Sequence, residues 1–418
     1  MHRDFFEQEI CHYSPRETLR DEIHDSFRLL STLTRFSYRA TKQILEYATC
    51  NMLNFFLVAT AFFTLLANAI TFPPPEPCTG NCTGHVHDPS VVRRNDGKYF
   101  RFTTNGRINI ATAPSMTGPW TYRCPALPKC SKINIKGKCD LWAPDVIKVD
   151  GKYYLYYSVS SMGSKTSDIG VATSPNMECG TWTDHGSIGI PTGSWNRIDA
   201  NLLSISPKSK GYMLWGSFWT GIWQARMASP PLRVVDNVKT VHLEQNTTKR
   251  PDNRPTGPSE GGFQFRWRIG TKDWYYLFFS SGGCCNVPPK LAPPGEEYKV
   301  MVCRSDRPEG PFVDKRGRNC ASKNGGTLVY WGRGNTFAAG GQGVMYDGGL
   351  RKVVMYYHYI DKRVGYAYEK FKFGWNVLRF GNDGWPVVVP WDRKKVRRDD
   401  GSEGEAIDER FPWTADLD

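Results

Sequence analysis

The sequence predicts an all-β fold, and within that class a five-bladed β-propeller. Three observations lead to this prediction. A polar insert followed by an aromatic-rich strand pattern recurs five times along the 418-residue chain. Glycine, proline and aromatic residues are abundant, which is typical of folds built from many short strands and turns. After residue 70, no long amphipathic helical pattern occurs.

Five polar inserts open the repeats, and each lies roughly ten residues ahead of an aromatic strand pattern. Four inserts carry a carboxylate and the fifth carries a glutamine. The inserts are His87-Asp88-Pro89, Trp142-Ala143-Pro144-Asp145, Ile198-Asp199-Ala200-Asn201, Ser259-Glu260-Gly261 and Gly340-Gly341-Gln342-Gly343. The strand patterns are residues 98–102, 152–157, 211–215, 274–279 and 352–357. A second repeated pattern, rich in small residues, follows each aromatic strand pattern. Each unit is therefore predicted to hold about four antiparallel strands.

The spacing of the repeats indicates how the units are arranged. They recur at intervals of about 50 to 80 residues, which is the range typical of propellers and repeat arrays. A four-stranded sheet of this kind cannot bury both faces alone, but sheets arranged radially pack against their neighbours. A β-sandwich is the alternative, and it does not explain the five-fold repetition. The propeller is predicted to span residues 70–390.

One apolar run precedes the repeats, at residues 52–69, and it starts at Met52 and ends at Ala69. Such a run predicts a signal peptide cleaved after Ala69, or an uncleaved signal anchor. Because a signal peptide normally stands first, residues 1–51 are interpreted as an upstream extension from a mispredicted start codon. Either interpretation places residues 70–390 outside the cytosol, secreted or held at a membrane. Residues 391–418 are predicted to form a flexible charged tail.

Cysteines and glycosylation sequons agree with export. Ten of the twelve cysteines follow the apolar run, and an even number can close as disulfides in an oxidising compartment. The adjacent Cys284 and Cys285 form either one vicinal bridge or two separate bonds. Sequons begin at Asn81 and Asn246. We therefore expect a secreted, disulfide-bonded, monomeric glycoprotein.

The formal net charge of +13 describes the surface and does not define the fold. No basic helix or known binding motif supports a nucleic-acid partner. The charge suits a solvated surface or an acidic polysaccharide near the substrate.

In a propeller, the five inserts converge at one mouth of the central channel. Asp88, Asp145, Asp199 and Glu260 then face one another, with Gln342 in the fifth position. Clustered carboxylates raise one another's pKa, which is costly for a protein that does not use them. The alternative is that they cap turns, and the packing context of Asp145 suits that alternative best.

Carboxylates around a groove, many aromatic residues and no metal-ligand cluster suit glycoside hydrolysis. One carboxylic acid protonates the leaving oxygen while another carboxylate activates water or attacks the sugar. A third carboxylate keeps the acid protonated at the working pH. Exposed aromatic residues stack on sugar rings or belong to the blade core; the candidates are Trp142, Phe218, Trp219 and Trp223.

From about Thr79 to Val389, the chain resembles glycoside hydrolase family 43, and in particular the fungal endo-1,5-α-L-arabinanases. The resemblance depends on an ordered set of motifs rather than on any one of them. They are His87-Asp88-Pro89, Asn196-Arg197-Ile198-Asp199, Gly216-Ser217-Phe218-Trp219, Ser259-Glu260-Gly261 and residues 140–145, 276–285, 340–343 and 356–359.

The resemblance implies a five-bladed propeller and an inverting enzyme. It assigns Asp88 as the general base that activates water and Glu260 as the general acid. Asp199 is the carboxylate that orients Glu260 and tunes its pKa. Asp145 falls outside this trio, and Trp142 beside it is the better sugar contact.

Two positions depart from the family's usual pattern. Ala200 follows Asp199 where the family usually has proline. Gln342 stands where bacterial relatives often have a histidine that helps to hold a calcium or sodium ion in the channel. A channel ion therefore stays open as an alternative, and no metal ligands are assigned. His358 is expected either near the channel or as an ordinary hydrogen-bonded strand residue.

The sequence therefore predicts a secreted hydrolase that cuts internal α-1,5 bonds of arabinan, a pectin side chain of plant cell walls, with inversion. An arabinofuranosidase, xylosidase or galactanase on the same fold is the first alternative. A non-catalytic carbohydrate-binding propeller is the second, and the presence of all three carboxylates disfavours it.

Overall fold

A computed structural model describes residues 72–205, 211–249, 258–284, 286–323 and 325–392. The predictions for residues 1–51, for the apolar run 52–69 and for the tail from residue 393 onward lie outside these described residues. No helix within the described ranges is long and apolar enough to cross a membrane.

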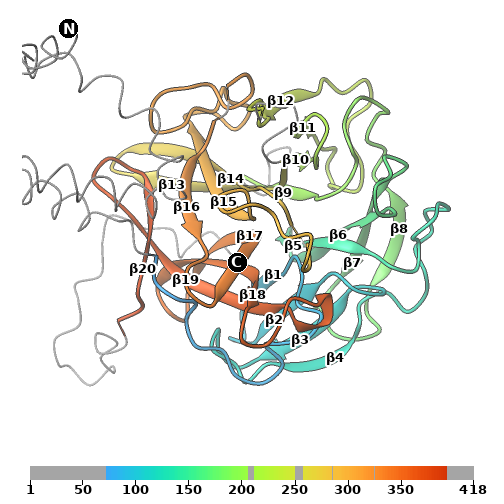
Figure 1. Cartoon of the computed structure of the whole chain (residues 1–418). Helices are drawn as coiled ribbons and strands as arrows, with labels where there is room; N and C mark the ends of the chain where they lie inside the picture. The colour runs from blue at the N-terminus through green and yellow to red at the C-terminus, as the bar shows by residue number, and fades with distance from the viewer. Residues whose placement is uncertain (1–71, 206–210, 250–257, 285, 324, 393–418) are drawn as a thin grey trace, which may run out of the picture. The chain divides into compact units, whose positions relative to one another are not determined.

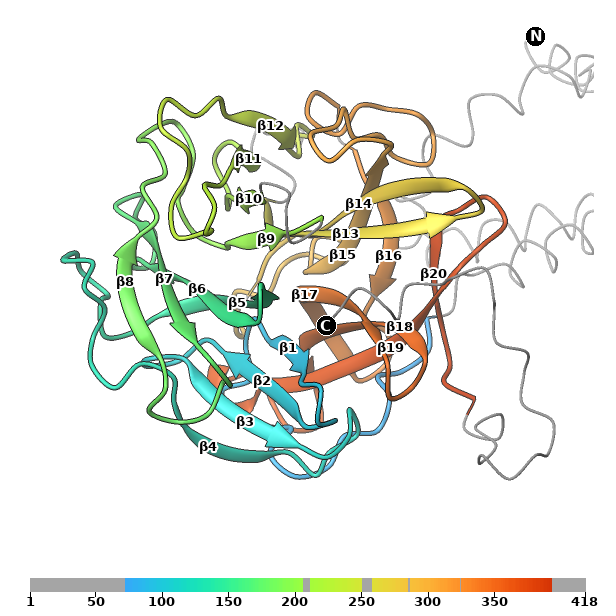
Figure 2. The same cartoon turned by 180° about the vertical axis from the view of Figure 1, so that it is seen from behind.

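The described residues form five four-stranded antiparallel sheets, which are the blades of a β-propeller (Figures 1 and 2). Within each sheet the strands are neighbours in sequence order. Blades one and two contain β1 (Ser90–Arg93), β2 (Tyr99–Thr103), β3 (Asn109–Ala113) and β4 (Thr121–Pro125), then β5 (Trp142–Val149), β6 (Lys152–Val159), β7 (Asp168–Ser174) and β8 (Thr183–Ser187). Blade three contains β9 (Asn201–Leu203), β10 (Tyr212–Trp215), β11 (Ile222–Arg226) and β12 (Val241–Glu244).

Blades four and five have the longest strands. Blade four contains β13 (Ser259–Ile269), β14 (Lys272–Ser281), β15 (Lys299–Ser305) and β16 (Thr327–Trp331). Blade five contains β17 (Thr336–Asp347), β18 (Lys352–Asp361), β19 (Lys372–Phe380) and β20 (Pro386–Val389), with the short 3₁₀ helix η2 (Tyr368–Lys370) before β19. The prediction of an all-β, five-bladed propeller is confirmed.

The first strand of each blade lies at the centre of the molecule. β1, β5, β9, β13 and β17 contact one another in this order, and β17 contacts β1, which closes the ring. Figures 1 and 2 show these five strands around the centre, with the later strands of each blade farther out. Four polar inserts precede or begin a first strand, and the fifth, at residues 340–343, lies within β17 where its pairing register shifts. The fold therefore brings the inserts together.

The aromatic second strands form the core because both of their faces are covered. In β6, Tyr153, Leu155 and Tyr157 belong to the cluster between blades one and two. Tyr154 and Tyr156 of the same strand belong to the cluster between blades two and three. A strand buried on both faces needs a continuous apolar run, which explains the repeated signature. Each buried ring contributes roughly 1.5–3 kcal/mol of transfer free energy.

Residues 72–83 join the last blade to the first. The backbone N–H of Glu76 donates to the carbonyl of Trp375 in β19, at 2.9 Å. The backbone N–H of Trp120, beside blade one, donates to the carbonyl of Thr79, also at 2.9 Å. This segment therefore bridges the two blades between which the ring closes.

The expected disulfides are present. Cys284 is also disulfide-bonded, and its neighbour Cys285 lies outside the described residues. The pairs given in full are Cys78–Cys82, Cys124–Cys179, Cys130–Cys139 and Cys303–Cys320. The Cys124–Cys179 bond connects β4 of blade one to the loop after β7 of blade two.

Candidate active site

The structure brings Asp88, Asp199 and Glu260 together at the centre of the propeller. Asp88 and Asp199 line one cavity of the channel, together with Gly261. The backbone N–H of Gly261 donates to Oδ2 of Asp199 at 3.0 Å, so the insert of blade three is bonded to the residue after Glu260. The φ angles of Asp88 and Asp199 are 43° and 59°. Left-handed backbone at residues other than glycine is costly and concentrates at functional sites.

Asp88 is surrounded by hydrogen-bond donors. Nδ1 of His87 lies 2.8 Å from Oδ2 of Asp88, and the hydroxyl of Thr104 donates to the same oxygen at 2.9 Å. Burial alone would raise the pKa of Asp88, but the charge and hydrogen bond of His87 lower it. The hydrogen bond from Thr104 lowers this pKa further, and the net result lies well below the ordinary value. Asp88 is therefore an ionised carboxylate that is held in one orientation.

Glu260 and Asp199 have the opposite electrostatic character. Burial and the charge of Asp88 raise the pKa of Glu260, while hydrogen bonds from Ser217 and Tyr298 lower it only in part. Burial raises the pKa of Asp199 well above its ordinary value, and the neighbouring charges of Glu260 and Asp88 add to this. Two interacting carboxyl groups titrate as a pair. The pair retains a proton at a pH where an isolated carboxyl group has lost it.

The loop between β10 and β11 places two aromatic side chains beside Glu260. The Ser217 hydroxyl donates to Oε2 of Glu260 at 2.7 Å. The next two residues, Phe218 and Trp219, are 44% and 47% exposed. Their φ angles are 58° and 32°, and two consecutive left-handed residues are a strained way to hold apolar rings in solvent. The arrangement leaves two apolar rings available for contact with a ligand.

The other two aromatic candidates have different surroundings. Trp142 is partly exposed at the start of β5, and its Nε1 lies 3.4 Å from Oδ2 of Asp140. No hydrogen bond or ring contact among the described residues links Trp142 to the three carboxyl groups. Trp223 packs between Trp195 and His242, with ring centroids 4.9 and 4.4 Å away. Trp223 therefore belongs to the packing of blade three.

Asp145 and Gln342 connect blades to each other. Asp145 is 6% exposed, and its Oδ2 accepts a hydrogen bond from the backbone N–H of Leu202 in β9 at 2.8 Å. Burial raises the pKa of Asp145 to about 6, against the effect of its hydrogen bonds from Leu202 and Asn201. The amide of Gln342 donates to the carbonyl of Gly261 at 2.7 Å. These two inserts use their side chains to hold the first strands in place.

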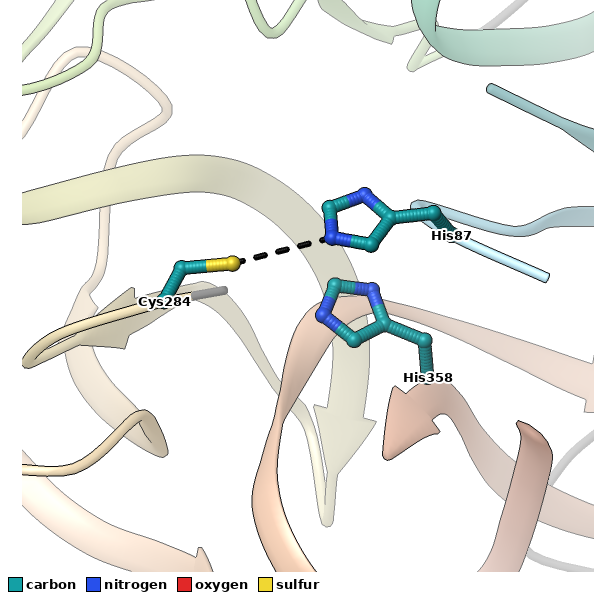
Figure 3. A group of neighbouring side chains, drawn as sticks. All are labelled: His87, Cys284 and His358. Carbon is teal, nitrogen blue, oxygen red and sulfur yellow. Dashed lines mark hydrogen bonds between the residues drawn. The ribbon is translucent and has the colours of Figure 1, made fainter. Parts of the chain in front are cut away.

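His358 lies beneath Asp88. It is fully buried, and its Nδ1 accepts a hydrogen bond from the backbone N–H of Asp88 at 3.0 Å. Its ring stacks on His87 with 3.9 Å between centroids, as Figure 3 shows. Burial lowers the pKa of His358 well below its ordinary value. The neutral ring therefore acts as an acceptor that fixes the backbone of Asp88.

His87, His358 and Cys284 are the one group among the described residues whose atoms are spaced closely enough to hold a metal ion (Figure 3). The chemistry of the three residues does not fit one. Cys284 is disulfide-bonded, and the thiolate is the form of cysteine that binds metals. Nδ1 of His358 accepts a hydrogen bond, so the ring proton of this neutral histidine is on Nε2, which has no lone pair to offer.

Sequence reasoning missed four contributors to this site. His87, Thr104, Ser217 and Tyr298 orient the carboxyl groups or shift their pKa values. His87 and Ser217 stand inside the motifs that carried the resemblance, so their position was a usable signal. Thr104 and Tyr298 lie outside those motifs.

Known proteins similar to this chain are glycoside hydrolases. The model of the family described as glycosyl hydrolases family 43 matches residues 82–386. The arabinan endo-1,5-alpha-L-arabinosidase A of Aspergillus aculeatus is 45% identical over 336 residues, which covers 79% of this chain and 99% of that protein. The protein of the same name from Aspergillus niger is 43% identical over 337 residues, with coverage of 79% and 99%.

Solved structures of similar proteins share the fold. An exo-1,5-alpha-L-arabinanase from a bovine ruminal metagenomic library superposes with a TM-score of 0.62 at 27% identity, covering 75% of this chain and all of that one. The alpha-L-arabinanase of Cellvibrio cellulosa complexed with arabinohexaose superposes with a TM-score of 0.63 at 25% identity, covering 73% and 96%.

Proposed function

The chain belongs to glycosyl hydrolases family 43, and we propose that it is an endo-acting hydrolase that cleaves internal α-1,5-L-arabinofuranosidic bonds of arabinan with inversion. One observation carries the proposal. An ionised carboxylate, Asp88, lies at the channel mouth with a carboxyl pair, Glu260 and Asp199, whose pKa values are raised. Environments that separate the pKa values of neighbouring carboxyl groups are how one site supplies both a base and an acid.

In the proposed reaction, Glu260 gives its proton to the glycosidic oxygen as the bond from the anomeric carbon to that oxygen breaks. Asp88 takes a proton from a water molecule, which attacks the anomeric carbon from the opposite face of the ring. The new carbon–oxygen bond has the opposite configuration, so an α-linkage gives a β-product. Asp199 orients Glu260 through Gly261 and disfavours its ionisation.

The low pKa of Asp88 has a specific role in this scheme. A carboxylate with so low a pKa is a weak base, but it stays ionised at mildly acidic pH, where Glu260 keeps its proton. The base is then ionised while the acid is protonated over a broad acidic range. The position of the carboxylate compensates for its weakness, because an oriented group reacts far faster than a free one.

We propose Phe218 and Trp219 as sugar-binding residues beside the acid, and Trp142 as a third on the neighbouring blade two. Exposed rings on a surface loop suit a long polysaccharide chain. The names of the curated relatives favour endo action on arabinan, whereas one solved structure of the same fold is an exo-enzyme. Exo action on arabinan, or action on other pentose or galactose polymers, is therefore the alternative that an experiment must exclude.

The test uses debranched arabinan as substrate for the purified protein, with Glu260→Ala and Asp88→Asn as variants. We expect a mixture of arabino-oligosaccharides and an early fall in viscosity, and a loss of roughly 10² to 10⁴ in kcat for each variant. Hydrolysis of xylan but not of arabinan would overturn the substrate assignment. Unchanged activity in both variants would overturn the proposed roles.

We also propose that the protein is secreted and acts as a monomer on plant cell-wall arabinan. The paired cysteines support an oxidising compartment. N-terminal sequencing of protein from culture medium tests the proposal, and the expected first residue is Ile70. A product that retains residues 1–51 would contradict the cleavage site.

A further inference from the structure

We infer that Glu244, in the outer strand β12 of blade three, is a positioning residue for Glu260. The inference rests on the function proposed above and adds a residue that the proposed mechanism does not use. Glu244 is fully buried, and its Oε1 accepts a hydrogen bond from the hydroxyl of Ser259 at 2.9 Å. Ser259 is the residue directly before Glu260 and opens strand β13. A buried carboxyl group therefore holds the residue next to the proposed acid.

The same part of β12 also holds the loop that carries the aromatic pair. The carbonyl of Ser259 accepts a hydrogen bond from the backbone N–H of Phe218 at 3.0 Å. The side-chain amide of Gln245, the next residue after Glu244, donates to the carbonyl of Trp219 at 3.2 Å. Glu244 is thus hydrogen-bonded to β13, the strand that carries Glu260. Gln245 is hydrogen-bonded to the β10–β11 loop, whose Ser217 contacts Glu260.

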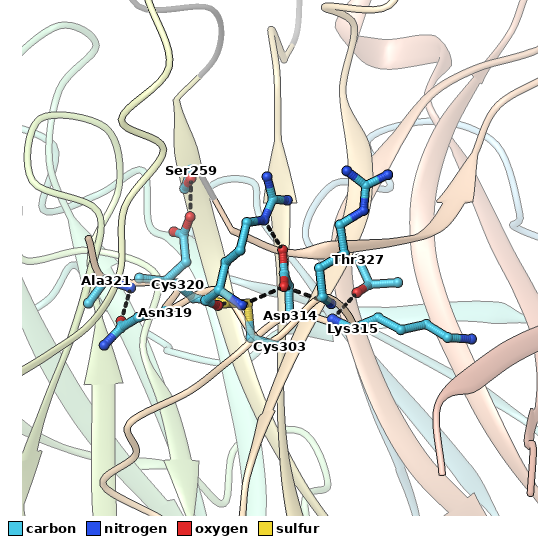
Figure 4. The surroundings of a disulfide bond; sticks show 11 residues. Ser259, Cys303, Asp314, Lys315, Asn319, Cys320, Ala321 and Thr327 are labelled. Atoms are coloured by element: carbon cyan, nitrogen blue, oxygen red, sulfur yellow. Dashed lines mark hydrogen bonds and ion pairs between the residues drawn. A yellow bond between two sulfur atoms is a disulfide. The ribbon is translucent and has the colours of Figure 1, made fainter. Parts of the chain in front are cut away.

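A hydrogen bond to the segment of blade four that contains Cys320 also holds the end of β12. The backbone N–H of Gln245 donates to the carbonyl of Cys320 at 3.0 Å. Cys320 is disulfide-bonded to Cys303 of β15 in blade four, and Figure 4 shows Ser259 in the surroundings of this disulfide. The Glu244–Ser259 hydrogen bond therefore lies where blades three and four are joined, one residue before the proposed acid Glu260.

The energetics of Glu244 explain why a carboxyl group at this place acts as a fixed support. Its second oxygen is buried and has no hydrogen-bond partner among the described residues. Burial raises the pKa of Glu244 to about 8, and the bond from Ser259 opposes this only in part. His242 lies two residues earlier in the strand and Glu260 lies beyond Ser259, and neither adds to the shift. At acidic pH, Glu244 is neutral, and its Oε1 still accepts the hydrogen bond from the Ser259 hydroxyl.

The raised pKa gives a readout that does not depend on catalysis. The folded pKa of about 8 lies above the ordinary 4.5. Glu244 thus contributes stability that is fully present below pH 4.5 and is lost as pH rises through about 8. Glu244→Gln keeps the oxygen acceptor but cannot ionise. In that variant the melting temperature should fall less between pH 5 and pH 8 than in the wild type, by about 2 °C or more.

The kinetic experiment compares Glu244→Gln and Glu244→Leu with the wild-type chain on debranched arabinan at pH 5. We expect Gln to keep kcat within about twofold. We expect Leu, which leaves the Ser259 hydroxyl without its acceptor, to lower kcat about tenfold or more with KM changed less than about threefold. The alkaline limb of the pH–kcat profile should also move in the Leu variant, because Glu260 is no longer held in place.

Asp347→Leu is the matched control. Asp347 is also fully buried and accepts a hydrogen bond from a hydroxyl, that of Tyr99 at 2.7 Å, at the end of β17 remote from the site. The control should lose stability but keep kcat within about twofold. If Glu244→Leu does not fold, Ser259→Ala removes the same bond from the other side and should lower kcat in the same way.

Two results would overturn the inference. One is a folded Glu244→Leu or Ser259→Ala variant with wild-type kcat and an unchanged pH profile. The other is an equal loss of kcat in Asp347→Leu, which would mean that the effect is general destabilisation. Both are distinct from failure of the proposed function, which would appear as an inactive wild-type chain or as an active Glu260→Ala variant.

Discussion

Asp88 and Glu260 differ in what surrounds each carboxyl group. Asp88 has two hydrogen bonds to Oδ2 and a histidine whose charge favours the ionised form. Glu260 also has hydroxyl donors, Ser217 and Tyr298, but its burial and the charge of Asp88 disfavour ionisation. The division into base and acid follows from these neighbours, because the two side chains have similar intrinsic pKa values.

His87 should set the acidic limit of activity. His87→Ala removes the charge and the hydrogen bond that lower the pKa of Asp88, so this pKa should rise toward the ordinary range. The base is then protonated at a higher pH, and the acidic limb of kcat/KM should move upward by about one pH unit or more. The measurement is a pH profile of arabinan hydrolysis from pH 3 to pH 8, in which the wild type should show no acidic limb and the variant should lose activity as the pH falls toward 3.

The control for this prediction is His85→Ala in the same segment. His85 is exposed and makes no hydrogen bond to Asp88. Its profile should match that of the wild type. A His87 variant that also shows no acidic limb would show that His87 does not govern the pKa of Asp88.

At the scale of single elements, the loop between β10 and β11 combines two tasks. Its serine contacts the carboxyl group of Glu260, and its two aromatic residues face solvent. Backbone strain at Phe218 and Trp219 is tolerated because each residue is held by a hydrogen bond. The Phe218 N–H donates to the Ser259 carbonyl, and the Gln245 side chain donates to the Trp219 carbonyl. In the proposed mechanism, one short segment therefore links substrate binding to proton donation.

Trp219→Ala should weaken substrate binding more than it slows the chemical step. The loss of one stacked ring is expected to raise KM for debranched arabinan about three- to tenfold and to change kcat less than about threefold. The matched control is Tyr122→Ala, another exposed aromatic residue, on the outer strand β4. A KM effect of similar size in both variants would argue against a role of Trp219 in the site.

For the whole molecule, the ring explains why distant segments form one site. Five sheets whose second strands are apolar on both faces pack radially, and the polar residues at or near the start of their first strands meet at a common mouth. That consequence could be predicted from the repeat of insert and aromatic strand, because a strand such as β6 is apolar on both faces only when neighbours cover both. The convergence of Asp88, Asp199 and Glu260 followed from the same pattern.

Other features could not be predicted because they depend on contacts between blades. The Cys124–Cys179 bond joins two blades, and nothing in the spacing of the cysteines indicates it. Trp223 resembles an exposed aromatic residue in sequence, but Trp195 and His242 pack against it. Glu244 lies in the last strand of blade three and belongs to none of the five polar inserts. Its hydrogen bond to Ser259 is therefore visible only in the folded structure.

The central claim is that Asp88 and Glu260 hydrolyse arabinan by a single displacement. The most direct test is proton NMR of the reducing ends released from debranched arabinan in the first minutes, before the anomers equilibrate. An inverting reaction on α-linkages forms the β-anomer first, and the α-anomer then appears slowly as equilibration proceeds. Initial release of the α-anomer would show retention and a covalent intermediate, and it would contradict the roles assigned to both residues.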